Sequence, residues 1–219
     1  MNRQIKNFFI LCLIVLSTPT AALTQSNKTS EANYLSSLEK AVVSEMNIAR
    51  TSPKQYASFL EQFRKHYDGK LLRLPGETPI LTKEGTGAVA EAIRFLRSQK
   101  PVSPLTPSKG MSLGAKDHIR DLGTSGASRH NGSEGSQPWD RVNRYGTWQK
   151  IIGENISFGH NKARNIVMTL MIDDGVPHRG HRKNIFNPDF RVVGVACGDH
   201  PTYKAICVMT FAGGYQEKN

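Results

Sequence analysis

The first half of the chain is patterned as a series of amphipathic helices, with apolar residues at intervals of three and four. Ser36 and Glu39 form the Ser-x-x-Glu pattern of a capping box, which marks the start of a helix. Pro53 suits the first position of a second helix, which we expect to stop at Gly69. Further helices are predicted at about 85–98, 108–122 and 162–173, with a short one after Pro138.

The pattern changes to alternation near the C-terminal end, which predicts a β-hairpin. A turn near Thr202 pairs Cys197 with Cys207, Val195 with Met209, and Val193 with Phe211. The three pairs then share one face, so a disulfide between the two cysteines is expected across the strands. Because the opposite faces are also mostly apolar, helices should cover the sheet on both sides. The predicted fold class is therefore α/β, a three-layer α-β-α sandwich in a single domain.

Residues 1–22 have the features of a secretory signal peptide. Two basic residues precede an apolar run from Phe8 to Leu16, which is short for a membrane span, and small residues follow it. Residues 23–35 are polar and are interpreted as a flexible leader, and residues 36–217 as the folded domain. We therefore expect a mature chain without a transmembrane segment, either secreted or, in a cell with an outer membrane, periplasmic.

The net charge is +11 at pH 7, and it falls to +9 when the two basic residues of the signal peptide are removed. A basic protein is attracted to anionic surfaces such as wall polymers and membranes. A solvated basic surface without a partner is the simpler interpretation. No strand interleaves basic and aromatic residues, so specific nucleic-acid binding is not expected.

Three residues in short, turn-like motifs are the first candidates for chemistry. His130, Glu154 and His181 stand in Ser-Arg-His-Asn-Gly, Gly-Glu-Asn-Ile and Gly-His-Arg-Lys-Asn-Ile. Imidazole and carboxylate groups bind metals and transfer protons near neutral pH. We expect the two histidines in loops, Glu154 in a strand or turn, and all three in one assembled site.

Other titratable residues have simpler explanations. His118 falls on the apolar face of a predicted helix and is interpreted as a core residue, and His178 as a surface residue. Asp173 and Asp174 lie at a predicted helix C-terminus, where acidic groups oppose the helix dipole. They therefore either serve the site or pair with the basic residues that follow His181.

Several catalytic signatures are absent from the sequence. It contains no His-Glu-x-x-His motif, no Gly-x-Ser-x-Gly elbow and no phosphate-binding glycine loop. The segment His178-Arg179-Gly180-His181, with Asn184 downstream, resembles the Asp-Arg-Gly-His segment of non-specific nucleases, which use that histidine as general base. Here His178 replaces the aspartate, so a nuclease built on His181 is the least favoured of the functions considered.

Taken together and in order, the motifs resemble those of the CAP superfamily, which includes cysteine-rich secretory proteins, antigen 5 and plant pathogenesis-related 1 proteins. The bacterial SCP-domain branch is the most similar. The stretches that carry the resemblance are residues 46–53, 127–130, 153–156, 170–175, 180–186 and 192–195. The order and spacing of Gly-Glu-Asn-Ile and Gly-His-Arg-x-Asn-Ile are specific to this group.

The resemblance implies an α-β-α sandwich with a cleft that contains two histidines and two acids. Carried over by position, the histidines are His130 and His181, which would hold a divalent cation, zinc or magnesium. The cleft acids are Glu154 and, where the family has a glutamate, Asp173, with Asp174 as an alternative. Leu170 stands where the family has a tryptophan.

The expected function is that of an exported binding module whose cleft takes a small ligand, a lipid, a peptide or a cell-wall polymer. The main alternative is a metal-dependent, protease-like hydrolase, in which Glu154 acts as general base on a metal-bound water. In that case Glu154 and His181 are the catalytic candidates. Fold and motif alone do not decide between these functions.

Overall fold

The structure is a computed structural model of the 219-residue chain and describes residues 32–218. The predicted signal peptide, residues 1–22, and residues 23–31 of the predicted leader lie outside the described residues. The last residues of that leader pack on the domain, since Ala32 and Leu35 are buried in its main core. The folded part therefore begins before Ser36.

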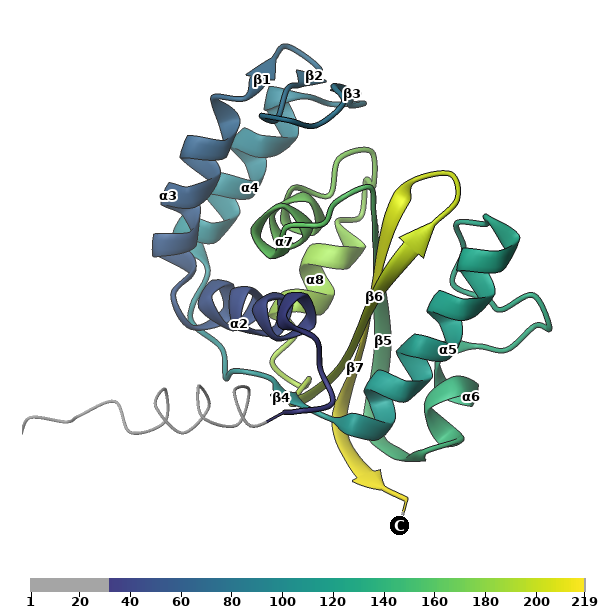
Figure 1. The fold of residues 1–219 in the computed structure, drawn as a ribbon. Coiled ribbons are helices and arrows are strands. Elements are labelled where there is room, and N and C mark those ends of the chain that lie inside the picture. The colour runs from purple at the N-terminus through teal and green to yellow at the C-terminus, as the bar shows by residue number, and fades with distance from the viewer. Residues whose placement is uncertain (1–31, 219) are drawn as a thin grey trace, which may run out of the picture.

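Seven helices and seven strands make up residues 32–218 (Figure 1). They follow one another as α2 (Ser37–Thr51), α3 (Pro53–Arg64), β1 (Tyr67–Asp68), β2 (Leu71–Leu72), β3 (Ile80–Leu81), α4 (Thr86–Ser98), β4 (Thr106–Pro107), α5 (Lys109–Ser125), α6 (Pro138–Asn143), β5 (Gly146–Phe158), α7 (Ala163–Ile172), α8 (Gly180–Phe186), β6 (Val192–His200) and β7 (Lys204–Glu217). The helices after Ser36 and Pro53 begin where predicted, and the capping box of Ser36 and Glu39 is formed.

The main sheet has four strands in the order β4-β6-β7-β5. Strands β5 and β6 both run antiparallel to β7, while the short β4 runs parallel to β6. This order leaves β5 at one edge of the sheet. A second, small sheet of β1, β2 and β3 lies beyond α3 and α4, at one end of the molecule (Figure 1).

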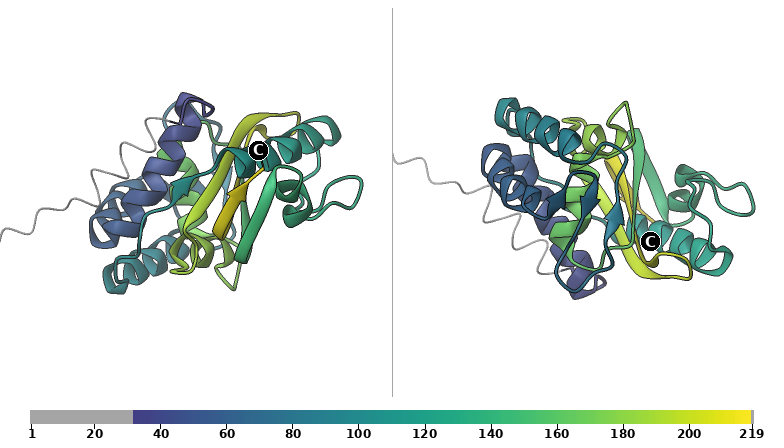
Figure 2. Two further views of the ribbon diagram at one scale, coloured as in Figure 1. Left: turned by 90° about the horizontal axis from the view of Figure 1, so that it is seen from below. Right: turned by 90° about the horizontal axis from the view of Figure 1, so that it is seen from above.

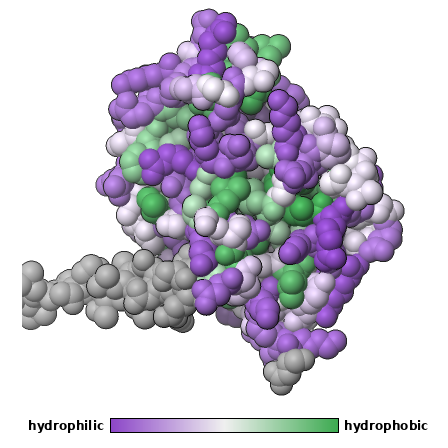
Figure 3. Space-filling view, viewed as in Figure 1, coloured by the Kyte–Doolittle hydropathy of each residue, from purple (hydrophilic) through white to green (hydrophobic). Residues whose placement is uncertain are grey.

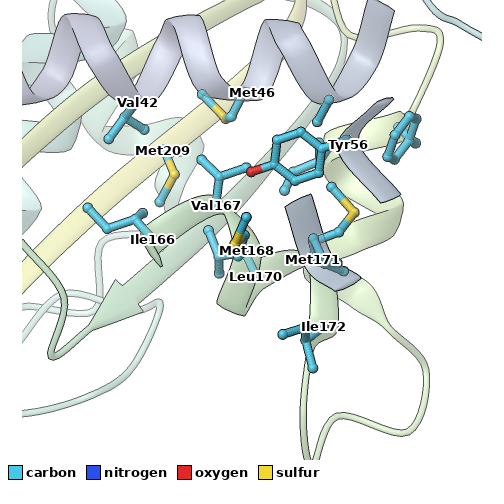
Figure 4. Close-up of a cluster of buried hydrophobic side chains, with 14 of the residues drawn as sticks. Val42, Met46, Tyr56, Ile166, Val167, Met168, Leu170, Met171, Ile172 and Met209 are labelled. Atoms are coloured by element: carbon cyan, nitrogen blue, oxygen red, sulfur yellow. The ribbon is translucent and has the colours of Figure 1, made fainter. Parts of the chain in front are cut away.

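Helices cover both faces of the main sheet, as predicted. Helices α5 and α6 lie on one face, and α2, α7 and α8 lie on the other, with α3 and α4 outside them (Figures 1 and 2). The larger core fills the space between the sheet and the second group; Val42 and Met46 of α2 meet Val167 of α7 and Met209 of β7 there (Figure 4). The three-layer α-β-α sandwich is confirmed.

The predicted hairpin and its register are confirmed. Cys197 pairs with Cys207, Val195 with Met209, and Val193 with Phe211. The two cysteines form a disulfide with an S–S distance of 2.04 Å. Alternation along the two strands was therefore sufficient to fix their pairing.

Two predicted helix ends differ from the structure. Helix α3 ends at Arg64, not at Gly69, and Tyr67 begins strand β1 instead. Gly69, at a φ of +58°, lies in the turn between β1 and β2. The glycine that was interpreted as the end of a helix therefore forms the turn of a hairpin. Helix α5 continues to Ser125, where Gly126 takes the left-handed conformation that commonly ends a helix.

A buried arginine ties α2 to the segment that follows α8. Arg50 is fully buried, and its guanidinium donates hydrogen bonds to the carbonyls of Ile185 (2.5 Å), Asn187 (3.1 Å) and Phe190 (3.0 Å). Burial, with a smaller contribution from the nearby Arg191, lowers the pKa of Arg50 to about 10, which leaves it charged at neutral pH. These contacts fix the C-terminal end of the helix that carries His181.

The surface is mixed in character. On the face shown in Figure 3, apolar side chains gather toward the middle and hydrophilic side chains surround them. Among residues 32–218, the most exposed large apolar residue is Leu81, at the end of the small sheet, with 78% of its surface accessible. Among residues 32–218, none of the helices combines the length and the apolar character needed to cross a membrane.

Candidate functional site

The candidate residues flank the edge strand β5 from both of its faces. Successive side chains of a strand point to opposite faces of the sheet. Glu154 accordingly contacts Arg141 of α6 on one face, whereas the neighbouring Asn155 contacts the backbone of His181 in α8 on the other. The Gly-Glu-Asn-Ile motif thus joins the two helical layers.

On the α6 face, His130 pairs with Glu154. Nδ1 of His130 lies 3.0 Å from Oε1 of Glu154, and Oε2 accepts a hydrogen bond of 2.8 Å from Nη2 of Arg141. The side chains of Glu154 and Arg141 are each 2% exposed, whereas that of His130 is 49% exposed. Glu154 is therefore one partner of a buried ion pair as well as the acceptor that orients His130.

The ring of His130 borders an open cavity of about 240 Å³. Gln137, Trp139 and Ile152 line the same cavity, and Trp139 is one of the exposed large apolar residues. Within residues 32–218, Nε2 of His130 makes no hydrogen bond, so this nitrogen is the one available to a ligand.

On the α8 face, His181 pairs with Asp173. Nδ1 of His181 lies 2.6 Å from Oδ1 of Asp173, and the backbone N–H of His181 donates to Oδ2 over 2.9 Å. Asp173 follows α7 in the left-handed conformation, at a φ of +56°, which places its side chain against the start of α8. The prediction of a loop at His181 was wrong, because residues Gly180–Phe186 form α8.

This second pair borders the larger of the two cavities, with a volume of about 380 Å³. Most of its lining is apolar and comes from two sources. Phe158 and Leu170 belong to the sandwich, whereas Tyr67 and Leu81 belong to the small sheet, residues 67–81, which we call the outer wall. The side chain of His181 is 25% exposed at this cavity.

The two aspartates after α7 have separate partners. Asp174 accepts hydrogen bonds from the backbone N–H groups of Lys83 (2.6 Å), Glu84 (2.8 Å) and Gly85 (3.1 Å), just before α4. Asp173, not Asp174, is therefore the aspartate that pairs with His181. Within the described part of the chain, neither aspartate forms a salt bridge with Arg182 or Lys183, and Arg182 binds Glu91 instead.

His118 and His178 lie where the sequence predicted them. His178 is exposed. His118 is fully buried, and its Nε2 lies 2.9 Å from the carbonyl oxygen of Arg129 and 4.0 Å from Oε1 of Glu154. Burial lowers the pKa of His118, and the carboxylate of Glu154 opposes this effect. The core histidine is thus also a neighbour of the site.

Two asparagines of the sequence motifs connect the pairs. Nδ2 of Asn155 donates to the carbonyl of His181 over 3.0 Å, and Nδ2 of Asn184 donates to Oδ1 of Asn155 over 2.8 Å. These bonds fix α8 against β5. Arg141 and Trp139 were missed by the sequence analysis, and the only signal for them was the short helix predicted after Pro138.

The arrangement of each histidine suits metal binding in one respect. Metal-ligating histidines usually present one ring nitrogen to the ion and donate the other N–H to a carboxylate. His130 and His181 both hold a carboxylate at Nδ1, which leaves Nε2 as the ligand atom. The two rings border separate cavities, however, and residues 32–218 contain no group of three or more His, Cys, Asp or Glu side chains placed to hold a metal ion.

The three-layer sandwich, with the Gly-Glu-Asn-Ile motif on edge strand β5 and the Gly-His-Arg-Lys-Asn-Ile motif on α8, agrees with the fold that the CAP resemblance implies. The chain belongs to the cysteine-rich secretory protein (CAP) family, whose sequence profile matches residues 90–211. The matched region includes both pairs and the disulfide, while the outer wall lies before it.

Individual relatives are distant. The chain is 29% identical over 107 residues to the uncharacterised protein YkwD of Bacillus subtilis, a match that covers 49% of this chain and 40% of YkwD. Among solved structures, it is similar to an outer surface protein of Borrelia burgdorferi (19% identity, TM-score 0.43, covering 53% of this chain and 80% of that one). It is also similar to an extracellular SCP-domain protein of Bacillus anthracis (20% identity, TM-score 0.42, covering 57% and 38%).

Proposed function

We propose that the protein is an exported binding module of the CAP family, whose ligand site is the cavity between the outer wall and the His181–Asp173 pair. The single observation behind this proposal is the composition of that cavity. Its volume of about 380 Å³ falls in the range of small-molecule sites, and its apolar lining converges on a few polar groups.

The lining favours a ligand with an apolar chain or side chain and a polar end. Leu81, Phe158 and Leu170 supply apolar surface, while Asp173 and His181 supply an acceptor and a ring nitrogen at one side. An acyl chain with a small polar head has these properties, as does an apolar peptide side chain. A bare cell-wall sugar has fewer apolar groups to bury and suits this cavity less well.

We also propose that Nε2 of His130 and Nε2 of His181 are the atoms through which the protein binds a divalent cation. Imidazole nitrogen is a common ligand of zinc, whereas magnesium prefers oxygen ligands, so the donor set favours zinc. Because the two rings border separate cavities, each histidine would meet a cation without the other, and one imidazole does not complete the four-coordinate shell of zinc. Weak binding is the expected result.

The hydrolase is the less favoured alternative because of the state of Glu154. A general base needs a carboxylate oxygen within reach of the water that it activates. Here Oε1 meets His130, and Oε2 accepts from Arg141 (2.8 Å) and from Oγ1 of Thr210 (3.4 Å). Both oxygens are already occupied, which suits an orienting role better than proton transfer.

Export itself is part of the proposal. The predicted signal peptide, residues 1–22, and the Cys197–Cys207 disulfide both favour a secreted or periplasmic protein, since disulfides persist in oxidising compartments. The positive charge favours contact with anionic wall or membrane surfaces.

The ligand proposal is tested by calorimetric titration with dodecanoate. We expect saturable binding to the wild-type protein and its loss in Leu170→Trp, which places the larger family residue in the cavity. Leu60→Met, a volume-conserving change at a buried residue outside the cavity lining, is the control and should bind normally. Absence of binding to the wild type would sink the acyl-ligand proposal.

The metal proposal has its own experiment. Zinc titration should give weaker binding in His130→Ala and in His181→Ala. It should give unchanged binding in His178→Ala, because that side chain is exposed and takes no part in the hydrogen bonds of either pair. Unchanged zinc binding in both site variants contradicts the proposal. Turnover of casein that requires zinc and disappears in Glu154→Gln would instead establish the hydrolase.

A further inference from the structure

Another cavity, lined by polar residues, lies beside the His130–Glu154 pair, between α5, α6 and the loop that joins them. Its volume is about 140 Å³, well above the ~30 Å³ that one water molecule occupies in the liquid. Three carboxylates, two serines and two arginines line it together with His118. This cavity has no place in the proposed function, and its lining is almost wholly polar.

His118 presents an unsatisfied acceptor to this region. Its Nε2 lies 2.9 Å from the carbonyl oxygen of Arg129, and because a carbonyl only accepts, Nε2 carries the proton. In a neutral ring Nδ1 is then a bare acceptor. Within residues 32–218 no donor reaches this buried atom. An unpaired buried polar atom is costly.

Arg141 has a buried donor without an acceptor. Its Nη1 donates to the carbonyl of Ser136 over 2.9 Å and its Nη2 to Glu154 over 2.8 Å. The remaining Nε–H is buried, and no acceptor among residues 32–218 reaches it. One cavity is therefore lined by a residue with a free acceptor and a residue with a free donor.

His200 shows what His118 looks like when its second nitrogen is satisfied. Nε2 of His200 lies 3.0 Å from the carbonyl oxygen of Ala127, and its Nδ1 accepts from the backbone N–H groups of Thr202 (3.3 Å) and Tyr203 (3.2 Å). His200 is 2% exposed, and it therefore has the same tautomer as His118 in a similarly buried place. Only the partner at Nδ1 differs.

The two histidines hold alternate carbonyls of one short segment. His200 binds residue 127 and His118 binds residue 129, and residues 126–129 have no regular secondary structure. The next residue is His130, whose side chain is half exposed. Backbone without helix or strand bonds is ordered by side-chain contacts such as these.

We propose that His118 and His200 are positioning residues that hold segment 127–129 and thereby present His130 to its cavity. The proposal rests on the proposed function only in giving His130 a ligand to meet. The hydrogen bonds themselves are properties of the free protein and are tested without any ligand.

The first test is nitrogen-15 NMR of the histidine side chains in the wild-type protein at neutral pH. Both His118 and His200 should give the signature of a neutral ring protonated at Nε2. An imidazolium, or protonation at Nδ1, in His118 would overturn the assignment.

The second test compares His118→Gln with His118→Asn. The glutamine amide nitrogen reaches the position of Nε2 and keeps the bond to the Arg129 carbonyl, whereas asparagine is too short. Loss of one such bond should speed hydrogen exchange of amides 128–131 roughly fivefold in the asparagine variant, the factor for about 1 kcal/mol. Exchange in the glutamine variant should stay near that of the wild type.

The pattern of exchange separates positioning from general destabilisation. A purely structural effect would speed exchange across α5 and β6 as well, and the glutamine variant would then show no rescue. Equal exchange of amides 128–131 in both variants and the wild type overturns the proposal. Zinc titration of the same proteins reports on the proposed function separately, since its failure leaves the tautomer and exchange results unchanged.

Discussion

Replacing Glu154 should destabilise the fold as well as alter the site, because the buried guanidinium of Arg141 depends on it. Nη2 of Arg141 lies 2.8 Å from Oε2 of Glu154, and each side chain is only 2% exposed. Removing one member of a buried pair leaves the other charge uncompensated, which costs roughly 3–5 kcal/mol. We expect Glu154→Ala to lower the free energy of unfolding by this amount, out of the ~5–15 kcal/mol of a typical domain.

The measurement is urea denaturation followed by far-UV circular dichroism with the disulfide intact. The control is Glu61→Ala, because Glu61 pairs with Arg97 at the surface, where the side chains are 37% and 64% exposed. Exposed pairs contribute about 0–1 kcal/mol, so the control should change stability little. A loss in Glu154→Ala no larger than that of the control refutes the reasoning.

A double variant separates the cost of an orphaned charge from the contribution of the pair. Replacing buried ion pairs by apolar side chains of similar volume is often neutral. Arg141→Met combined with Glu154→Leu should therefore be more stable than Glu154→Ala alone. Equal instability of the two proteins would mean that the hydrogen bonds of Glu154 with His130 and Thr210, not its charge, carry the effect.

Three further predictions concern stability. Hydrogen bonding from Arg179 lowers the pKa of Glu84 to about 2, so this carboxylate stabilises the fold above its unfolded pKa of about 4.5 and loses that contribution as pH falls toward 2. Glu84→Gln should therefore flatten the pH dependence of the free energy of unfolding between these two values, and an unchanged slope contradicts the pairing. Reduction of the disulfide, which closes a loop with a sequence separation of 10, should cost about 3 kcal/mol by the chain-entropy argument, measured by urea denaturation with and without reductant; coincident curves would argue against it. Gly194→Ala should lower the free energy of unfolding by about 1–3 kcal/mol, because the added Cβ would overlap the backbone of Met111 where α5 crosses β6. Thermal unfolding measures this loss, and an unchanged midpoint temperature would mean that α5 shifts to make room for the methyl group.

The features that followed from the sequence are those set by local pattern. Alternation fixed the pairing of Cys197 with Cys207, and the Ser36 capping box fixed the start of α2. The choice between Asp173 and Asp174 stayed open, because residues adjacent in sequence are resolved only by their partners in space. Asp174 proved to bind the loop before α4, some 90 residues away in the chain.

The rest depends on contacts that no local pattern records. His118 was correctly placed in the core, but its bond to the Arg129 carbonyl requires the loop after α5 to fold back over that helix. Arg141 lies in a six-residue helix, and its role as the partner of Glu154 follows only from their contact in the folded structure. The outer wall was not predicted as a sheet, and its first residues were assigned to the end of the helix that begins at Pro53. Its two-residue strands are too short to show alternation.

The adjacency of Asp173 and Asp174 has a thermodynamic consequence. One carboxylate orients His181, and the other binds the three backbone amides that lead from the outer wall into α4. A ligand that displaces the outer wall therefore shifts Asp174, which is adjacent in the chain to Asp173, the residue that orients His181. Binding at the wall and binding at His181 should be energetically linked, and by reciprocity each should change the affinity of the other by the same factor.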